Sequence, residues 1–138
     1  MGMYDTLFAK LKCPNSGLER EVGIQFKWVD PCLNEYRMDD KLEIGPYGDL
    51  WIPENYICWI CSDKESVPIK YVDHFTFIHL NQGKFEEVLS EKDFRERFIR
   101  ENKLSLPEGQ HLYINQFRYQ EDNPSLPDFL QKVLSKRD

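Results

Sequence analysis

Hydrophobic and polar residues alternate in several stretches of the chain, which is the pattern of half-buried β-strands. The clearest case is the segment 19–29, in which alternate positions are apolar: Val22, Ile24, Phe26 and Trp28. A shorter segment with the same alternation, residues 3–12, precedes it. Between them lies Cys-Pro-Asn-Ser-Gly at residues 13–17, which is rich in turn-forming residues. The pattern therefore predicts a β-hairpin with Cys13 at its tip.

A second group of strands is expected further along the chain. Residues 67–80 are apolar on both faces, as is typical of a strand in the middle of a sheet. The turn residues 81–84 lead from it into residues 85–89, so we expect a second hairpin here. Upstream, the strand-like run 56–61 breaks at Ser62 and Asp63, and no helix is expected to follow it.

Two later segments carry the start signals of α-helices. Ser90 and Asp93 form a capping box, and an apolar stripe ending at Ile99 follows them, in a helix expected to end near residues 102–104. Ser125 and Asp128 repeat this signal before the last apolar face. A strand is expected between the helices, over residues 111–119. The expected fold class is α+β, with an N-terminal antiparallel β part followed by strands and two helices.

The chain length and composition predict one domain. The 138 residues are 41% hydrophobic, which suits a single core over 1–138, with a β-rich part at 3–62 and an α+β part at 63–138. The net charge of −6, with basic residues scattered among acids, argues against direct nucleic-acid binding, which needs clustered cations. No apolar run reaches the roughly 18 residues of a membrane span, and the first residues lack the pattern of a signal peptide. We therefore expect a cytoplasmic protein.

The cysteines give the most specific indication of a chemical site in the sequence. Four cysteines in a chain of this kind favour free thiols or a metal site over a disulfide framework. Cys58 and Cys61 have the Cys-x-x-Cys spacing of a zinc knuckle. The segment that begins at Cys13 reads like a second knuckle in which Ser16 takes the place of a cysteine.

These two motifs resemble those of zinc-ribbon proteins, whose first knuckle has the form Cys-Pro-x-Cys-Gly. More loosely, the chain resembles small uncharacterised bacterial proteins that begin with such a ribbon, over roughly residues 4–62. In this class, both cysteines of each knuckle bind a structural zinc ion. The resemblance therefore implies a zinc site with Cys13, Cys58 and Cys61 as ligands, and the chain departs from the pattern at Ser16.

The departure leaves two interpretations open, because a protonated serine hydroxyl is a poor zinc ligand. Either no zinc binds and the knuckles persist as backbone turns, or a three-cysteine site is completed by Cys32, a histidine, an acid or water. For Cys32 a role as a small buried apolar residue is favoured. The histidines are expected to be satisfied or exposed, and His74 and His79, five residues apart in a strand, should point to opposite faces.

No phosphate-binding loop, metalloprotease helix or nucleophile elbow occurs in the sequence. The favoured function is a non-enzymatic interaction or adaptor protein that binds a protein partner through an acidic, aromatic-bearing surface. Trp51 is the first candidate for an exposed anchor, although a position covering the edge of a small core is favoured. The alternatives are a structural zinc ribbon within a larger, nucleic-acid-associated complex, and a thiol-dependent redox protein using Cys58 and Cys61. The redox alternative is disfavoured because no helix N-terminus activates the first thiol.

Overall fold

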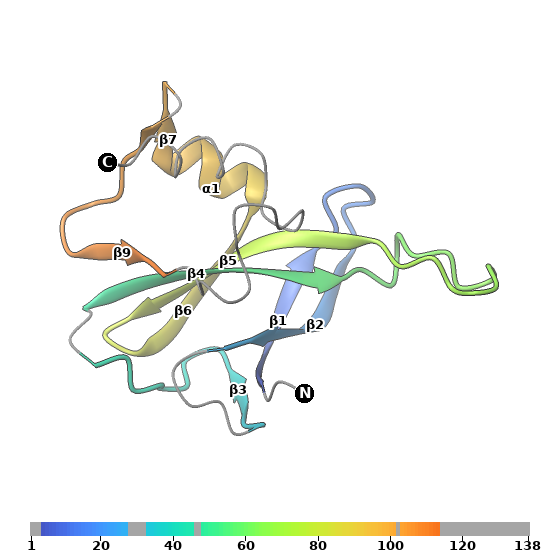
Figure 1. The fold of residues 1–138 in the computed structure, drawn as a ribbon, viewed down its shortest axis with the longest axis horizontal. Coiled ribbons are helices and arrows are strands. Elements are labelled where there is room, and N and C mark those ends of the chain that lie inside the picture. Colours follow the sequence, from blue (N-terminus) through green and yellow to red (C-terminus); the bar gives the residue numbers. More distant parts are fainter. Residues whose placement is uncertain (1–3, 28–32, 46–47, 102, 114–138) are drawn as a thin grey trace.

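The computed structural model describes residues 4–27, 33–45, 48–101 and 103–113 of the chain. Within these ranges the chain forms nine strands and one helix, arranged as in Figure 1. In chain order they are β1 (Asp5–Lys12), β2 (Glu19–Phe26), β3 (Glu35–Arg37), β4 (Asp49–Ile57), β5 (Asp73–Asn81), β6 (Lys84–Ser90), α1 (Glu91–Phe98), β7 (Ile99–Arg100), β8 (Lys103–Leu104) and β9 (Gln110–Leu112).

The strands form two main sheets and one short ribbon. The first sheet has the order β2-β1-β3, the second has the order β6-β5-β4-β9, and β7 pairs with β8. The coarse α+β class is thus confirmed, with sheet dominating the described residues. The expectation of an antiparallel N-terminal part holds only for β1 and β2, because β3 pairs with β1 in parallel. β9 also joins the second sheet by parallel pairing with β4.

The first predicted hairpin is confirmed. β1 and β2 pair over their full length, from Asp5 opposite Phe26 to Lys12 opposite Glu19. The turn between them is closed by the Gly17 N–H, which donates to the Cys13 carbonyl at 2.8 Å. Gly17 has a φ of 73°, a left-handed conformation that glycine adopts without a steric penalty. The glycine at this position therefore allows the turn that places Cys13 beside the second sheet.

β4 and β5 form a second long hairpin. Their antiparallel register runs from Asp49 opposite Asn81 to Ile57 opposite Asp73. The connecting segment, residues 58–72, projects away from the body of the protein (Figure 1). The expected boundary between residues 62 and 63 falls within this connection, so strands from both expected parts share one sheet. The β5–β6 hairpin predicted over residues 81–84 is also confirmed.

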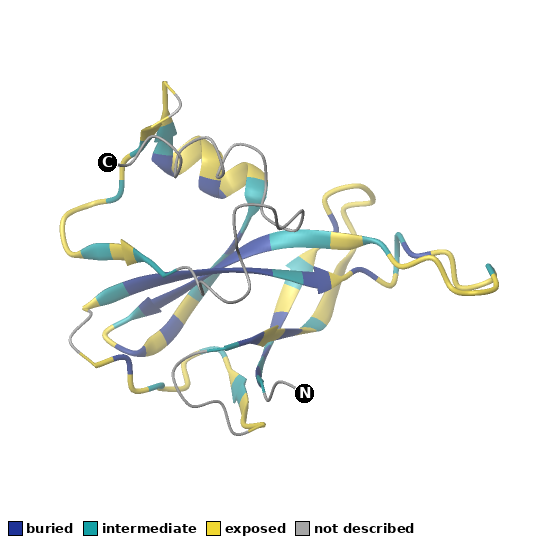
Figure 2. Cartoon of the chain, in the orientation of Figure 1, coloured by how far each residue is buried: buried dark blue, intermediate teal, exposed yellow. Residues whose placement is uncertain are grey.

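The second sheet is covered on both faces, which gives a three-layer arrangement (Figure 2). One core lies between the two sheets; its fully buried members include Leu7, Ile24, Phe26, Leu50, Ile78 and Leu80. The other core lies under the helix and consists of Trp51, Phe77, Leu89, Phe94 and Phe98. Alternate residues of β4 and β5 enter the two cores, because successive side chains of a strand point to opposite faces. The expectation of a central strand over residues 67–80 is confirmed from Asp73 onward, whereas residues 67–72 belong to the projecting connection and Val67 is almost fully exposed.

Trp51 belongs to the core under the helix. Its side chain is fully buried, it stacks on the His79 ring with centroids 4.2 Å apart, and its indole N–H donates to Gln110 Oε1 at 2.8 Å. The candidate role of Trp51 as an exposed anchor is therefore wrong. Its N–H finds an acceptor from the neighbouring strand, which removes the usual cost of burying an indole N–H.

Helix α1 begins where the sequence predicts. The Ser90 hydroxyl accepts a hydrogen bond from the Asp93 N–H at 3.1 Å, which caps the first turn. The helix ends at Phe98, earlier than expected, because Ile99 is extended and enters β7. No helix of the described residues is long and apolar enough to cross a membrane. The second predicted helix, which begins at Ser125, lies outside the described residues, as does the predicted strand beyond residue 113.

Replacing Phe94 by alanine tests the packing of α1 on the sheet. The Phe94 ring is fully buried and stacks on Phe77 with centroids 3.7 Å apart. We expect Phe94→Ala to lower the free energy of unfolding by about 3–5 kcal/mol, because it removes buried surface and leaves a cavity. The exposed Lys92→Ala on the same helix should change it by no more than about 0.5 kcal/mol. Urea denaturation measures both, and equal effects would contradict this packing.

Candidate metal centre

Four side chains with metal-binding donors converge at one end of the β1–β2 hairpin. They are Cys13, Cys58, Cys61 and His74, and one donor atom from each lies within 4.8 Å of all the others. Cys13 and Cys58 are buried, and Cys61 and His74 are partly buried. The donors come from three segments that are distant in sequence, so the fold brings them together.

Cys13 is positioned by the turn between β1 and β2. Its N–H donates to the Leu18 carbonyl at 2.9 Å, and its own carbonyl accepts from Gly17. Ser16 lies in the same turn, where its hydroxyl accepts the Leu18 N–H at 3.3 Å. Ser16 therefore supports the backbone of the turn and is not one of the four donors.

Cys58 and Cys61 are positioned by a turn of the same kind. The Ser62 N–H donates to the Cys58 carbonyl at 3.0 Å, as Gly17 does to Cys13. The Ser62 hydroxyl also donates to that carbonyl at 2.7 Å and accepts the Val72 N–H at 2.9 Å. Since the Cys58 N–H bonds to the Val72 carbonyl at 2.8 Å, this turn is held to the chain leading into β5.

His74 is supplied by β5. It lies directly opposite Tyr56 in the β4–β5 register, close to the point where β4 leads into Cys58. The ring of Tyr56 meets the His74 ring edge to face, with centroids 5.8 Å apart. Burial, followed by the charges of the three neighbouring thiolates, raises the pKa of Tyr56 to about 12. The Tyr56 phenol is therefore uncharged beside His74 at physiological pH.

Three distances within the cluster lie within about 0.5 Å of the edges of a tetrahedral zinc site. The Cys13 and Cys61 sulfurs are 3.3 Å apart, and His74 Nε2 lies 3.8 Å from Cys13 Sγ and 3.4 Å from Cys61 Sγ. Zinc bonds to sulfur and nitrogen imply edges of about 3.8 Å between sulfurs and about 3.6 Å between sulfur and nitrogen. Three sulfurs and one imidazole nitrogen form a donor set typical of structural zinc sites.

Hydrogen bonds around the cluster shift the pKa values of Cys13 and Cys61 in opposite directions. Donors from Ser16, above all its hydroxyl, lower the pKa of Cys13 to about 5 in spite of burial. The Asn15 side-chain amide lies 3.4 Å from Cys61 Sγ and lowers the pKa of that thiol. The contact with Cys13, burial and Cys58 outweigh this effect, and together they raise the pKa of Cys61. In the metal-free cluster, Cys13 thus ionises before Cys61.

The structure brings together all three cysteines that the sequence singles out. Of the fourth ligands left open there, the histidine option is the one that the described residues fill, through His74. Cys32 lies outside the described residues. His74 and His79 point to opposite faces as expected, and His79 instead lies beside Trp51, with Glu87 Oε2 3.0 Å from its Nδ1. The sequence favoured satisfied or exposed histidines with no part in a site. For His74 this expectation does not fit its position among the three thiols.

Comparison with known proteins adds no relative. No protein-family model matches the chain, and the searches of curated proteins and of solved structures returned no significant match. The resemblance to zinc ribbons therefore remains a prediction based on the motifs.

The role of Ser16 predicts a measurable change in thiol ionisation. In metal-free protein, thiolate absorbance near 240 nm should show one thiol titrating near pH 5, well below the ordinary value of 9.0. Ser16→Ala should move this titration to higher pH, because the strongest donor to the thiolate is lost. Since the folded pKa lies below the unfolded one, stability from this thiolate is complete above about pH 9 and is lost as the pH falls through about 5.

Asn15→Ala is the matched control for this experiment. It removes the donor to Cys61 and leaves the Ser16 hydroxyl in place, so the low titration should persist. Cys13→Ser should abolish it. If the thiol of the Ser16→Ala variant still titrates near pH 5, the Ser16 hydroxyl is not the main cause of the low Cys13 pKa, and the assignment is contradicted.

Proposed function

We propose that the chain is a non-enzymatic protein whose fold is stabilised by one structural zinc ion. Its ligands would be Cys13, Cys58, Cys61 and His74. The observation that carries the proposal is the convergence of these four donors within 4.8 Å of one another. Chance clustering of three thiols and an imidazole from three separate segments is rare without a function. The donor types are those that zinc prefers, while calcium and magnesium require oxygen ligands.

The proposed site is structural because its coordination sphere would be complete. Catalytic zinc sites keep an open position for water or substrate, whereas structural sites use four protein ligands. Here the four donors lie within 4.8 Å of one another and would fill all four positions of a tetrahedral ion, and two of them are buried. A closed site of this kind supplies folding energy, which in zinc-finger peptides amounts to about 10–16 kcal/mol.

The proposed ion would join the two β-hairpins of the protein. Cys13 belongs to the turn of the β1–β2 hairpin, and the other three donors belong to the β4–β5 hairpin and its connection. Fixing these hairpins to one another would hold the projecting residues 58–72 at a defined angle. This supports the role of an interaction or adaptor protein, whose contact surface must be rigid before it binds.

Purified protein should contain one equivalent of zinc if this proposal is right. Elemental analysis before any chelating step measures the content, and cobalt substitution should give thiolate-to-cobalt charge-transfer bands with tetrahedral ligand-field bands. Removal of the metal should lower the free energy of unfolding by several kcal/mol, because a ligand present at 1,000 times its Kd contributes about 4 kcal/mol.

Variants separate the four proposed ligands from the remaining donors. Cys61→Ser and His74→Ala should lose most of the bound zinc, whereas Cys32→Ser, His111→Ala and Ser16→Ala should keep one equivalent. The His111 comparison is informative because that histidine is exposed and distant from the cluster in sequence. Full zinc content in His74→Ala, or none in the wild-type protein, would overturn the proposal.

A redox function is the second candidate, and one observation favours it. Cys13 Sγ and Cys61 Sγ lie 3.3 Å apart, and the pKa of Cys13 is lowered to about 5. Thiolates are the reactive form in thiol–disulfide exchange. The pair would therefore be Cys13 and Cys61, in place of the Cys58–Cys61 pair that the spacing suggests. The Cys13 thiolate would attack one sulfur of an external disulfide and displace a first thiolate, and Cys61, after giving up its proton, would attack Cys13 Sγ in the mixed disulfide and displace the second. The external disulfide takes the two electrons, and its displaced thiolates take up the Cys61 proton and one from solvent.

Equilibration of metal-free protein in glutathione buffers tests this candidate. A redox protein should form a Cys13–Cys61 disulfide reversibly, with a potential near that of cytosolic glutathione, about −220 to −320 mV. Peptide mapping identifies the pair, and Cys61→Ser should abolish it. The redox function would be eliminated if the disulfide does not form. It would also be eliminated if one equivalent of zinc fully protects the thiols from oxidation and the reduction potential lies far from this range.

A further inference from the structure

A groove runs beside the projecting hairpin, on the outer face of β2. It has a volume of about 650 Å³, and its walls come from β2, β4 and the two chains of the hairpin connection. Its lining residues are Glu21, Val22, Gly23, Gln25, Asn55, Tyr56, Ile57, Trp59, Tyr71 and Asp73. None of these is a proposed zinc ligand, but the groove adjoins the proposed zinc site, because Tyr56 also contacts His74 and Trp59 lies between Cys58 and Cys61 in the sequence.

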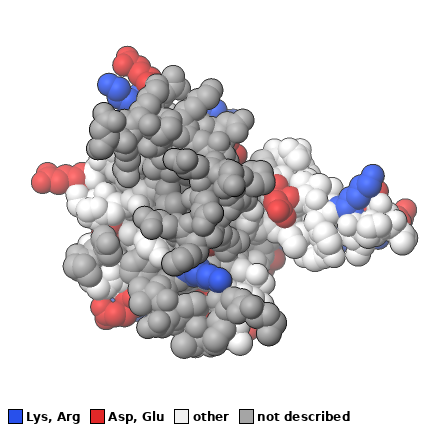
Figure 3. All heavy atoms as spheres, viewed as in Figure 1, with Lys and Arg blue, Asp and Glu red and all other residues white. Residues whose placement is uncertain are grey.

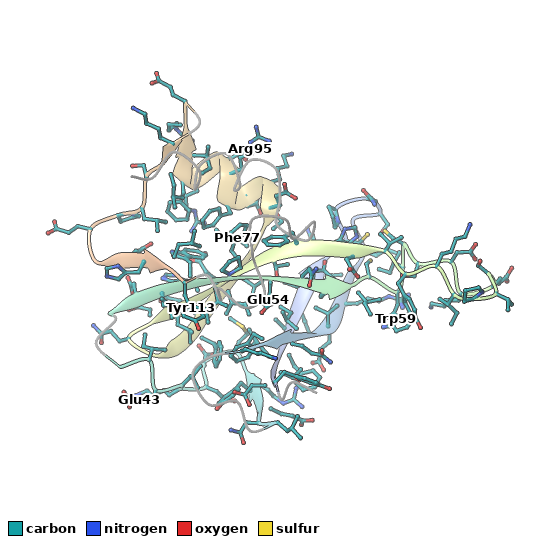
Figure 4. The ribbon with its side chains drawn as sticks, viewed as in Figure 1. Glu43, Glu54, Trp59, Phe77, Arg95 and Tyr113 are labelled. Atoms are coloured by element: carbon teal, nitrogen blue, oxygen red, sulfur yellow. The ribbon has the colours of Figure 1, made fainter. Side chains whose placement is uncertain are left out.

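Two exposed aromatic rings form one wall of the groove. Trp59 is 47% exposed and Tyr71 is 55% exposed, and their rings meet edge to face with centroids 5.5 Å apart. Trp59 lies just beyond the ends of β4 and β5 (Figure 4). Ile57, 41% exposed, continues the apolar surface toward β4. Large exposed aromatic side chains in a concave site are the residues that most often anchor a binding partner.

The charges of the groove are of one sign. Glu21 and Asp73 line it, and no lysine, arginine or histidine does so among the residues that the structure describes. Asp73 lies opposite Ile57 in the β4–β5 register, on the same edge of the groove as the aromatic pair. In Figure 3 the projecting hairpin shows mainly uncharged atoms, with basic and acidic groups near its end. Carboxylates beside aromatic faces attract a cation through both its charge and its contact with the rings.

Two arginines lie near the groove, and neither lines it. Arg37 approaches Glu21 at 3.8 Å, but both side chains are more than half exposed, so this ion pair is weak and replaceable. Arg20 lines a smaller adjoining cavity of about 140 Å³ beneath Trp59. Asp73 is therefore the carboxylate that faces the groove with the least competition.

We propose that this groove binds a protein segment through an arginine or lysine side chain, with Trp59 and Tyr71 contacting the cation and its methylene groups, and Asp73 and Glu21 pairing with its charge. The charge complementarity selects a basic partner over an acidic peptide or a nucleic acid, whose phosphates the two carboxylates repel. Arginine fits better than lysine, because its planar guanidinium stacks on an aromatic ring while its N–H groups bond to a carboxylate.

The probe for this proposal is a short capped peptide with one central arginine flanked by glycine and serine. Titration into ¹⁵N-labelled protein should shift the Trp59 indole signal, assigned by its loss in Trp59→Phe, and the amide signals of Asp73 and Glu21. The buried Trp51 indole should not move. Replacing arginine by citrulline, which is nearly isosteric and neutral, should weaken binding about tenfold. A peptide with glutamate at that position should not bind.

Protein variants provide the matched controls. Asp73→Asn and Trp59→Ala should each weaken binding of the arginine peptide about fivefold to tenfold. Glu86→Gln removes an exposed carboxylate of β6, and Val67→Ala removes an apolar side chain, 97% exposed, from the end of the hairpin. Neither of these two controls should change the affinity.

Three results would overturn the proposal: equal affinity for the arginine and citrulline peptides, an unshifted Trp59 indole, or signals that move only with a single-stranded oligonucleotide. Zinc content measured on the same samples keeps this proposal distinct from the previous one. Purified protein that contains no zinc but binds the arginine peptide supports the groove proposal and overturns the proposed zinc site. Zinc-loaded protein that does not bind the peptide supports the zinc site and overturns the groove proposal.

Discussion

The register of β4 against β5 is the constraint on which the other features depend. Nine residue pairs, from Asp49–Asn81 to Ile57–Asp73, set this register. They place Tyr56 opposite His74, and they turn one face of the pair toward the first sheet and the other toward α1. A slip of one residue would move every side chain of a strand to the opposite face. His74 would then leave the thiols, and Phe77 would leave the core under the helix.

The two cysteine turns share one backbone hydrogen-bonding pattern, although only the second has a cysteine at its fourth position. In both turns, the N–H four residues after the first cysteine donates to that cysteine's carbonyl, through Gly17 in one and Ser62 in the other. Ser16 occupies the position that corresponds to Cys61, and it acts on Cys13 by hydrogen bonding. His74 of β5 lies beside the three thiols and supplies the fourth donor of the cluster. The proposed zinc site therefore does not need a thiol at residue 16.

Local signals in the sequence predicted much of this structure, and features set by distant contacts were missed. Turn residues and alternation located the β1–β2 and β5–β6 hairpins, and the capping serine located the start of α1. The parallel pairings of β3 and β9 leave no local pattern, because their partners lie far along the chain. His74 was missed for the same reason. Alternation places it on the face of Ile78 and Leu80, but only the register of β4 shows that this face continues to Cys58. Turn residues and a proline flank Trp51, so the sequence favoured only a position at the edge of a core, whereas packing against the later helix buries the side chain completely.

The uneven spacing of the four donors along the chain has a consequence for the order of assembly during synthesis. Cys61 and His74 are 13 residues apart, whereas Cys13 and Cys61 are 48 apart. Closing the longer loop costs about 1 kcal/mol more in chain entropy. During synthesis Cys13 emerges first, and residues 58–74 emerge together later. Three of the four donors lie on the β4–β5 hairpin and its connection, whereas Cys13 lies in the turn of the other hairpin. Docking of the two hairpins, and not formation of either, is then the step at which the four donors first meet.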